Sequence, residues 1–193
     1  RSRNLPYGVR YQGSSAVECR SALTHLPIRR EDFTFIDLGC GKGRCLLIAS
    51  EFPFRRIMGV EFSRELCEVS RKNLEIVQQS MARRLNAEVV CQDAAEFVFP
   101  EEPLVLYFYN PFDREVMQVV VQNVQRSLRS VPRQVYVIYL NPKHAGLWED
   151  DDTFRVMHQE ANCKIYATDW HSIKKEQEHE PVEANENVPQ SQG

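Results

Sequence analysis

From residue 33 onward the chain alternates short apolar runs with amphipathic stretches, and this alternation limits the folds that it can adopt. The runs typical of β-strands are Phe33–Leu38, Ile57–Glu61, Glu88–Cys91, Leu104–Tyr109 and Gln134–Leu140. The stretches between them repeat apolar residues at helical spacing, as amphipathic helices do. This order predicts an α/β domain in which helices cover both faces of a mostly parallel sheet.

Two of these runs differ from the others in being apolar without alternation. Leu104–Tyr109 and Val135–Leu140 have the composition expected of central strands that are covered on both sides, and an Asn-Pro pair follows each of them. Further on, Phe154–Glu160 and Cys163–Thr168 can pair as a hairpin around Ala161-Asn162, which would complete a seven-stranded sheet.

The length of 193 residues suits one such domain with short additions. We expect residues 1–30 to form an N-terminal helical lid segment, with a helix over Ser14–Leu26, and residues 31–170 to form the core. Residues 171–193 contain two lysines, five glutamates and almost no apolar residues, which predicts a disordered acidic tail.

Composition argues against several functions. No apolar run approaches the roughly 18 residues of a membrane helix, and no signal peptide opens the chain, so we expect a cytoplasmic protein. The net charge of −3 comes from the tail, and a neutral body makes nucleic acid an improbable partner. The six cysteines and five histidines show no metal-ligand spacing, which predicts buried reduced thiols and no metal. No sequence feature indicates an oligomeric state.

Three glycines mark the turn after the first predicted strand. Gly39, Gly41 and Gly43 stand between that strand and a predicted helix, where an open α/β sheet binds its ligand. A dinucleotide fingerprint would need a third glycine at position 44, which is Arg. Asp37 lies inside the motif, and a carboxylate there repels a pyrophosphate but suits the ammonium and sulfonium of S-adenosylmethionine.

The later strands also end in residues that can bind a nucleoside. Glu61 ends the second strand and can accept hydrogen bonds from ribose hydroxyls in either a nicotinamide or an S-adenosylmethionine enzyme. Asp93 follows the third strand and offers a carboxylate for an adenine amino group, with the small Ala94 beside it. Asn110 and Phe112 follow the fourth strand.

These four segments together resemble the successive motifs of class I S-adenosylmethionine-dependent methyltransferases, over roughly residues 33–142. The resemblance extends to small bacterial members of unassigned substrate and, more loosely, to lysine methyltransferases that modify histone cores. It implies a Rossmann-like sheet of order 3-2-1-4-5-7-6 whose last strand is antiparallel. It also implies that S-adenosylmethionine is bound by Gly39, Gly41, Gly43, Glu61 and Asp93.

Relatives of this kind often begin with a Tyr-rich segment that closes over the cofactor. The resemblance therefore makes Tyr11 and Ser14–Ser15 candidate lid residues, although Ser14–Ser15 suit a helix cap equally well.

Methyl transfer from a sulfonium needs chiefly a correctly held nucleophile. Asn110 is the first candidate to orient an unprotonated amine, with Phe112 as an apolar wall. Enzymes that methylate planar nitrogens often carry a second proline where this chain has Asn-Pro-Phe, so we expect the acceptor to be a small molecule or a protein side chain. Two alternatives stay open: an NAD(P)-dependent oxidoreductase, and a catalytically inactive scaffold that binds S-adenosylmethionine.

Overall fold

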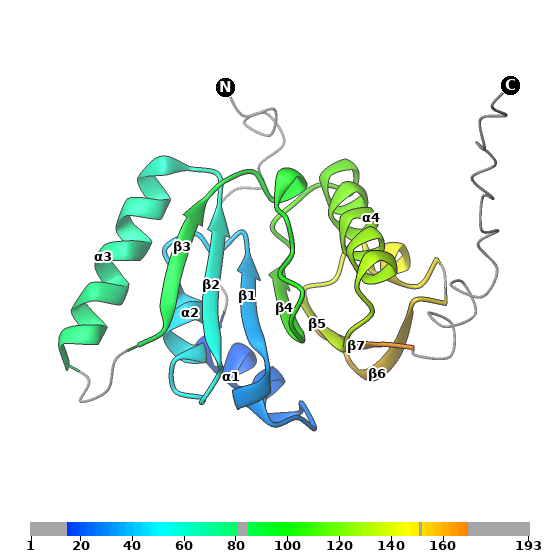
Figure 1. Ribbon diagram of the computed structural model, residues 1–193, viewed down its shortest axis with the longest axis horizontal. Helices are drawn as coiled ribbons and strands as arrows, with labels where there is room; N and C mark the ends of the chain where they lie inside the picture. The colour runs from blue at the N-terminus through cyan, green and yellow to red at the C-terminus, as the bar shows by residue number, and fades with distance from the viewer. Residues whose placement is uncertain (1–14, 81–84, 151, 170–193) are drawn as a thin grey trace, which may run out of the picture.

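The computed structural model describes residues 15–80, 85–150 and 152–169. Seven strands form one sheet in the order β3-β2-β1-β4-β5-β7-β6 (Figure 1). The strands are β1 (Thr34–Leu38), β2 (Arg56–Glu61), β3 (Ala87–Cys91), β4 (Leu104–Tyr109), β5 (Val135–Leu140), β6 (Phe154–Glu160) and β7 (Cys163–Thr168). The predicted fold class and strand order are confirmed.

The first five strands run parallel, which gathers their carboxyl ends at one edge of the sheet. Asp37 on β1 pairs with Gly59 on β2 and Tyr107 on β4, so these positions lie side by side. β7 runs antiparallel to both β5 and β6, as predicted. The expected ligand edge therefore belongs to the parallel half of the sheet.

Helices cover both faces of this sheet. They are α1 (Ala16–Thr24), α2 (Arg44–Ala49), α3 (Arg64–Ser80) and α4 (Arg114–Ser130), with short 3-10 turns η1 (Arg30–Asp32), η2 (Ala94–Glu96) and η3 (Ala145–Trp148). α4 and η3 pack on one face against residues such as Leu106 and Phe108, whereas α1 and α2 pack on the other against Val105 and Tyr107. Successive residues of β4 thus enter opposite halves of the core, as strand geometry requires.

The helix predicted over Ser14–Leu26 is present but shorter, and it belongs to the core. Ser15 is its N-cap, accepting a hydrogen bond from the backbone N–H of Glu18 at 3.5 Å. Cys19 and Leu23 are fully buried in the same cluster as α2. Ser15 therefore acts as the helix cap; Tyr11 and Ser14 lie outside the described residues. The domain limits at residues 30 and 170 stay predictions.

One expectation for the side chains, the burial of all cysteines, needs correction. Cys91 is exposed, unlike the other cysteines, because β3 is an edge strand and Cys91 is its last residue. The hairpin of β6 and β7 also contains a bulge: its register shifts between Val156 and His158, which leaves Met157 as an additional residue. The described residues include no helix with the length and apolar character needed to cross a membrane.

Candidate cofactor-binding and active site

The turn after β1 depends on glycine at each of the three predicted positions. Gly39, Gly41 and Gly43 have φ of 83°, 55° and 81°, in the left-handed region that side chains disfavour. A Cβ on Gly39 would overlap Pro111, and one on Gly43 would overlap the hydroxyl of Ser70. The loop is therefore packed tightly against both the end of β4 and α3.

Glu61 lies at the end of β2 and is 5% exposed. Its carboxylate accepts hydrogen bonds from the backbone N–H groups of Gly41 and Ser63, each at 3.0 Å, one on each oxygen. Each carboxylate oxygen can accept more than one hydrogen bond, so capacity for a ligand hydroxyl remains. The glycine loop thus fixes the orientation of the predicted ribose acceptor.

Asp93 and Ala94 lie beyond the end of β3. The side chain of Asp93 caps η2 by accepting from the backbone N–H of Ala95 at 2.9 Å. Ala94 is buried, with its small side chain facing the core cluster that includes α4. The cap holds the Asp93 carboxylate in place at the sheet edge.

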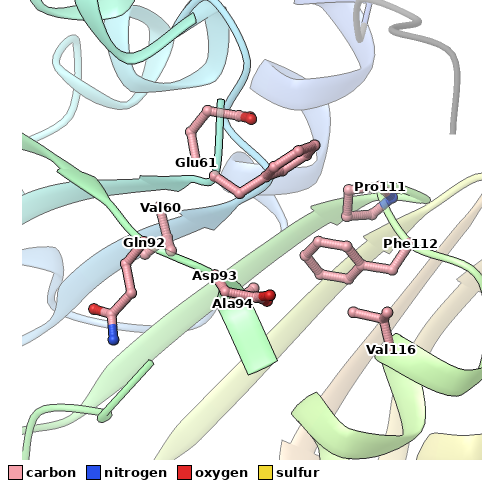
Figure 2. Close-up of a pocket in the computed structure, with 10 residues that line it drawn as sticks. Val60, Glu61, Gln92, Asp93, Ala94, Pro111, Phe112 and Val116 are labelled. Atoms are coloured by element: carbon pink, nitrogen blue, oxygen red, sulfur yellow. The ribbon is translucent and has the colours of Figure 1, made fainter. Parts of the chain in front are cut away.

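A pocket joins these residues at the carboxyl ends of β1, β2, β3 and β4. Figure 2 shows Glu61 and Gln92 on one side and Phe112 and Val116 on the other, with Ala94 between them. The residues lining the pocket are Gly39, Val60, Glu61, Phe62, Gln92, Asp93, Ala94, Pro111, Phe112 and Val116. The structure thereby brings together five of the predicted site residues: Gly39, Glu61, Asp93, Ala94 and Phe112.

Phe62 and Val116 also line the pocket, and neither is among the predicted site residues. Phe62 directly follows Glu61 at a strand end, so its position was a usable signal for an aromatic wall. Val116 lies in α4, a helix whose apolar residues are expected to pack in the core. It is 7% exposed and packs in the core, and it also lines the pocket.

Asp37 lies behind this pocket and is not among its lining residues. Its carboxyl is 4% exposed, and burial raises its pKa well above the usual range, with further contributions from Cys45 and Glu61. The hydroxyl of Tyr107 is also buried here, and burial raises its pKa too. Asp37 thus occupies a poorly solvated position below the glycine loop.

Asn110 follows β4 with φ of 44°, a left-handed conformation that asparagine tolerates better than most residues. It is buried, and its side-chain oxygen accepts a hydrogen bond from the hydroxyl of Tyr139 at 3.2 Å. Burial raises the pKa of Tyr139 to about 12, so this hydroxyl keeps its proton and donates. Tyr139, which sequence analysis did not single out, orients the predicted catalytic amide.

Other polar residues near the strand ends do not line the pocket. Asp113 is the N-cap of α4, accepting from the backbone N–H of Val116 at 3.0 Å. The backbone N–H of His144 approaches the Tyr139 hydroxyl at 3.4 Å. Lys42 lies in the glycine loop and Arg44 is the first residue of α2, and both are exposed.

A family model for a methyltransferase domain matches residues 35–131, half of the chain. The chain belongs to this methyltransferase family. None of the curated proteins compared with it matches. The predicted class I methyltransferase that uses S-adenosylmethionine is confirmed, with its acceptor unassigned.

Solved structures of other methyltransferases share the fold. A putative methylase from Haemophilus influenzae is 14% identical, with a TM-score of 0.58 over 79% of this chain and 98% of the other. An RNA methyltransferase from Salinibacter ruber, in complex with S-adenosylhomocysteine, is 18% identical, with a TM-score of 0.53 over 81% and 92%. Magnesium protoporphyrin IX methyltransferase from Synechocystis, with bound S-adenosylmethionine, is 16% identical, with a TM-score of 0.51 over 79% and 75%.

The family match covers every candidate of this methyltransferase from Asp37 to Phe112 but ends before β5. Tyr139 therefore comes from the part of the methyltransferase that the family model does not describe. The pocket residues and the glycine loop lie within the matched region, whereas Tyr139, which donates to Asn110, lies beyond it.

Proposed function

We propose that S-adenosylmethionine lies in the pocket beside Gly39 and that the chain transfers its methyl group to an amine on a small molecule or protein side chain. The observation that carries this proposal is Glu61, a buried carboxylate held by two backbone N–H groups and aimed at a pocket that also contains Asp93. Buried carboxylates are rare unless they are paired or functional, and this one has room for further donors.

The nucleoside half of the cofactor suits the two ends of the pocket. Glu61 would accept hydrogen bonds from the ribose hydroxyls. Such bonds to a carboxylate are stronger than bonds between two neutral groups. Asp93 would accept from the adenine amino group, while Ala94, Phe112 and Val116 would contact the faces of the ring. An apolar slot that ends in a carboxylate is what a flat base with one amino group requires.

The methionine half would lie over the glycine loop. The left-handed turn at Gly39 and Gly41 keeps side chains away, so a ligand can approach the backbone closely. Bound S-adenosylmethionine supplies an electrophilic methyl group on a positively charged sulfur. Asp37 lies directly below this loop, and its poorly solvated carboxyl would be stabilised by such a cation.

Asn110 is the residue proposed to orient the acceptor. Its side-chain oxygen is positioned by Tyr139 and retains a second lone pair, which can accept a hydrogen bond from an N–H of an incoming amine. Phe112, which packs edge-on against Phe108 at 6.4 Å, would give an apolar boundary that desolvates the amine.

The charge of the pocket favours a small molecule or a protein side chain as acceptor. Of the lining residues that the structure describes, Glu61 and Asp93 carry charge and none is lysine or arginine. Nucleic-acid binding depends largely on cationic contacts to phosphates. The solved neighbours include RNA methyltransferases, which makes RNA the acceptor to test against this proposal.

Binding measurements test the cofactor site. Calorimetry should give micromolar or tighter binding of S-adenosylmethionine and S-adenosylhomocysteine and none of NADH. Glu61→Ala should weaken this binding. Glu96→Ala is its matched control, because Glu96 is an exposed carboxylate near Asp93 that does not line the pocket. Binding of NADH without binding of S-adenosylmethionine would support the oxidoreductase alternative instead.

Transfer of a tritiated methyl group to fractionated cell extract tests the acceptor. We expect label in the small-molecule or protein fraction, and a strong reduction with Asn110→Ala at unchanged cofactor affinity. Label in the RNA fraction alone would overturn the proposed acceptor class. Tight cofactor binding with no label in any fraction would favour the inactive scaffold.

A further inference from the structure

Two histidines and a glutamate meet between α1 and the β6–β7 hairpin, away from the pocket. His25 is the C-cap of α1, whereas His158 and Glu160 lie two residues apart on β6 and share one face of the strand. Their possible ligand atoms all lie within 4.8 Å of one another. Within the described ranges, this is the one group of three such side chains close enough to hold a metal ion.

The bulge in β6 creates this arrangement. Before the bulge Val156 pairs with Tyr166, whose side chain packs on the α4 face of the sheet. After it His158 pairs with Ile165, which packs on the α1 face with Leu23. Since paired residues point to the same face, the additional residue turns His158 and Glu160 toward α1.

The three side chains contact one another, and one ring nitrogen has a hydrogen bond of the type that supports metal-bound histidines. His158 Nε2 lies 3.2 Å from Glu160 Oε1, and the rings of His25 and His158 stack with centroids 4.5 Å apart. His25 Nδ1 lies 2.8 Å from the backbone oxygen of Ser21, to which it can donate. Metal-bound histidines commonly make this type of bond with the second ring nitrogen, which leaves Nε2 for the metal.

The charges around the group favour a cation. Glu18 lies near the tip of the hairpin, where it accepts a hydrogen bond from Asn162 at 2.9 Å. The ligand atoms that lie close together belong to the two imidazoles and the Glu160 carboxylate, and Cys163 is not part of this group.

We propose that His25, His158 and Glu160 bind a divalent transition metal ion of the zinc class, with water in the fourth position. Two imidazoles with one carboxylate are typical ligands of Zn²⁺, which prefers four-coordinate geometry. For both rings to bind one ion, the exposed ring of His25 has to leave its stacked position on His158. The ion links the end of α1 to the terminal hairpin, two segments separated by most of the sequence. This site is independent of the proposed function.

Zinc uptake by the full chain tests the proposal. After incubation with zinc and desalting, the wild-type protein should retain about one equivalent, and Co²⁺ should give visible absorption bands of a tetrahedral site. His158→Gln and Glu160→Gln should each weaken zinc binding at least tenfold. With free zinc at about a hundredfold excess over Kd, the unfolding temperature should rise by roughly 5–10 °C, and EDTA should reverse the rise.

His144→Gln is the matched control, since it removes a histidine outside the group and should keep full zinc uptake. His171→Gln combined with His179→Gln tests the tail histidines in the same way. Glu160 is exposed, so Glu160→Gln should fold normally, as its unfolding temperature in EDTA will show. Zinc uptake that is absent from the wild type, or equal in wild type and both ligand variants, would overturn the proposal.

Discussion

Glu61 and Asp37 are carboxyl groups on neighbouring strands, about equally buried, but their surroundings differ. Glu61 is 5% exposed and accepts two backbone hydrogen bonds. Asp37 is 4% exposed and faces a thiol, a buried tyrosine hydroxyl and Glu61 itself, with its pKa raised by burial above all. The first carboxyl group is held by hydrogen bonds from the backbone, and the second is one whose charged form the fold destabilises.

This difference suggests separate contributions to cofactor binding. The hydrogen bonds of Glu61 hold an acceptor in place before the ligand arrives, so little ordering is needed on binding. Asp37 gains most when a cation arrives, because the cation compensates for the missing solvation. Variants of Glu61 and Asp37 should separate the two contributions.

Glu61→Ala should have the largest effect on binding. Loss of charge-assisted hydrogen bonds of roughly 2–3 kcal/mol corresponds to about a 30- to 150-fold weaker affinity for S-adenosylmethionine. Calorimetry with Glu96→Ala as control would measure it. An affinity within twofold of the wild type would mean that the ribose is bound elsewhere.

Asp37→Asn should weaken binding but stabilise the fold. We expect roughly tenfold lower affinity for S-adenosylmethionine, and a gain in stability on the order of 1 kcal/mol, or about 2–4 °C in unfolding temperature, at neutral pH. The gain arises because asparagine removes a buried group whose ionisation the fold opposes. Calorimetry and thermal unfolding measure the two effects.

The control for this variant is Asp32→Asn, which neutralises an exposed aspartate beside Arg29. It should change the affinity for S-adenosylmethionine and the unfolding temperature little. If Asp37→Asn instead lowers stability at every pH, the Asp37 carboxylate is stabilised by the fold and the contrast with Glu61 disappears.

The pH dependence of these effects follows from the raised pKa of Asp37. Between the unfolded and folded pKa values the folded chain binds more protons, so this group's contribution to stability falls as pH rises through that window. The advantage of Asp37→Asn should therefore increase with pH. Wild-type affinity for S-adenosylmethionine should increase over the same window, with release of a proton on binding.

The ligand's own amino group also titrates, near pH 8. The ratio of wild-type to Asp37→Asn affinity cancels that effect, and calorimetry in two buffers of different ionisation enthalpy counts the protons released. A ratio that stays constant with pH, without proton release, would contradict the raised pKa.

The fold could be predicted from sequence because its signals are local. The strands are apolar runs, and all seven were located, the hairpin of β6 and β7 with its limits as predicted. The bulge at Met157 has no local sequence signal. One additional residue moves the side chain of His158 to the other face of the sheet, but the residue types along this short strand do not show it. The contact between His25 and His158 could not be predicted either, because it joins two segments that are distant in sequence.

The site was predicted in part. Glycines and carboxylates at strand ends can be recognised in sequence because topology brings those ends together. What the side chains contact there was not predictable: Gly41 donates to Glu61, and Asn110 accepts from Tyr139, a residue 29 positions later. These contacts decide which carboxylate is stabilised and which amide is oriented.

Tyr139→Phe should have the smallest effect, and it extends the comparison to the end of β4. Asn110, like Glu61, is held by a hydrogen bond; the lost bond should reduce stability by about 1 kcal/mol and leave cofactor affinity unchanged. Methyl transfer to the cell-extract fraction that accepts the label should become several-fold slower. The decrease should be in kcat, because the Asn110 amide is no longer fixed. Tyr136→Phe, a half-buried tyrosine on the same strand, is the control. Equal transfer by the two variants would mean that Tyr139 only packs beside Asn110 and does not position it.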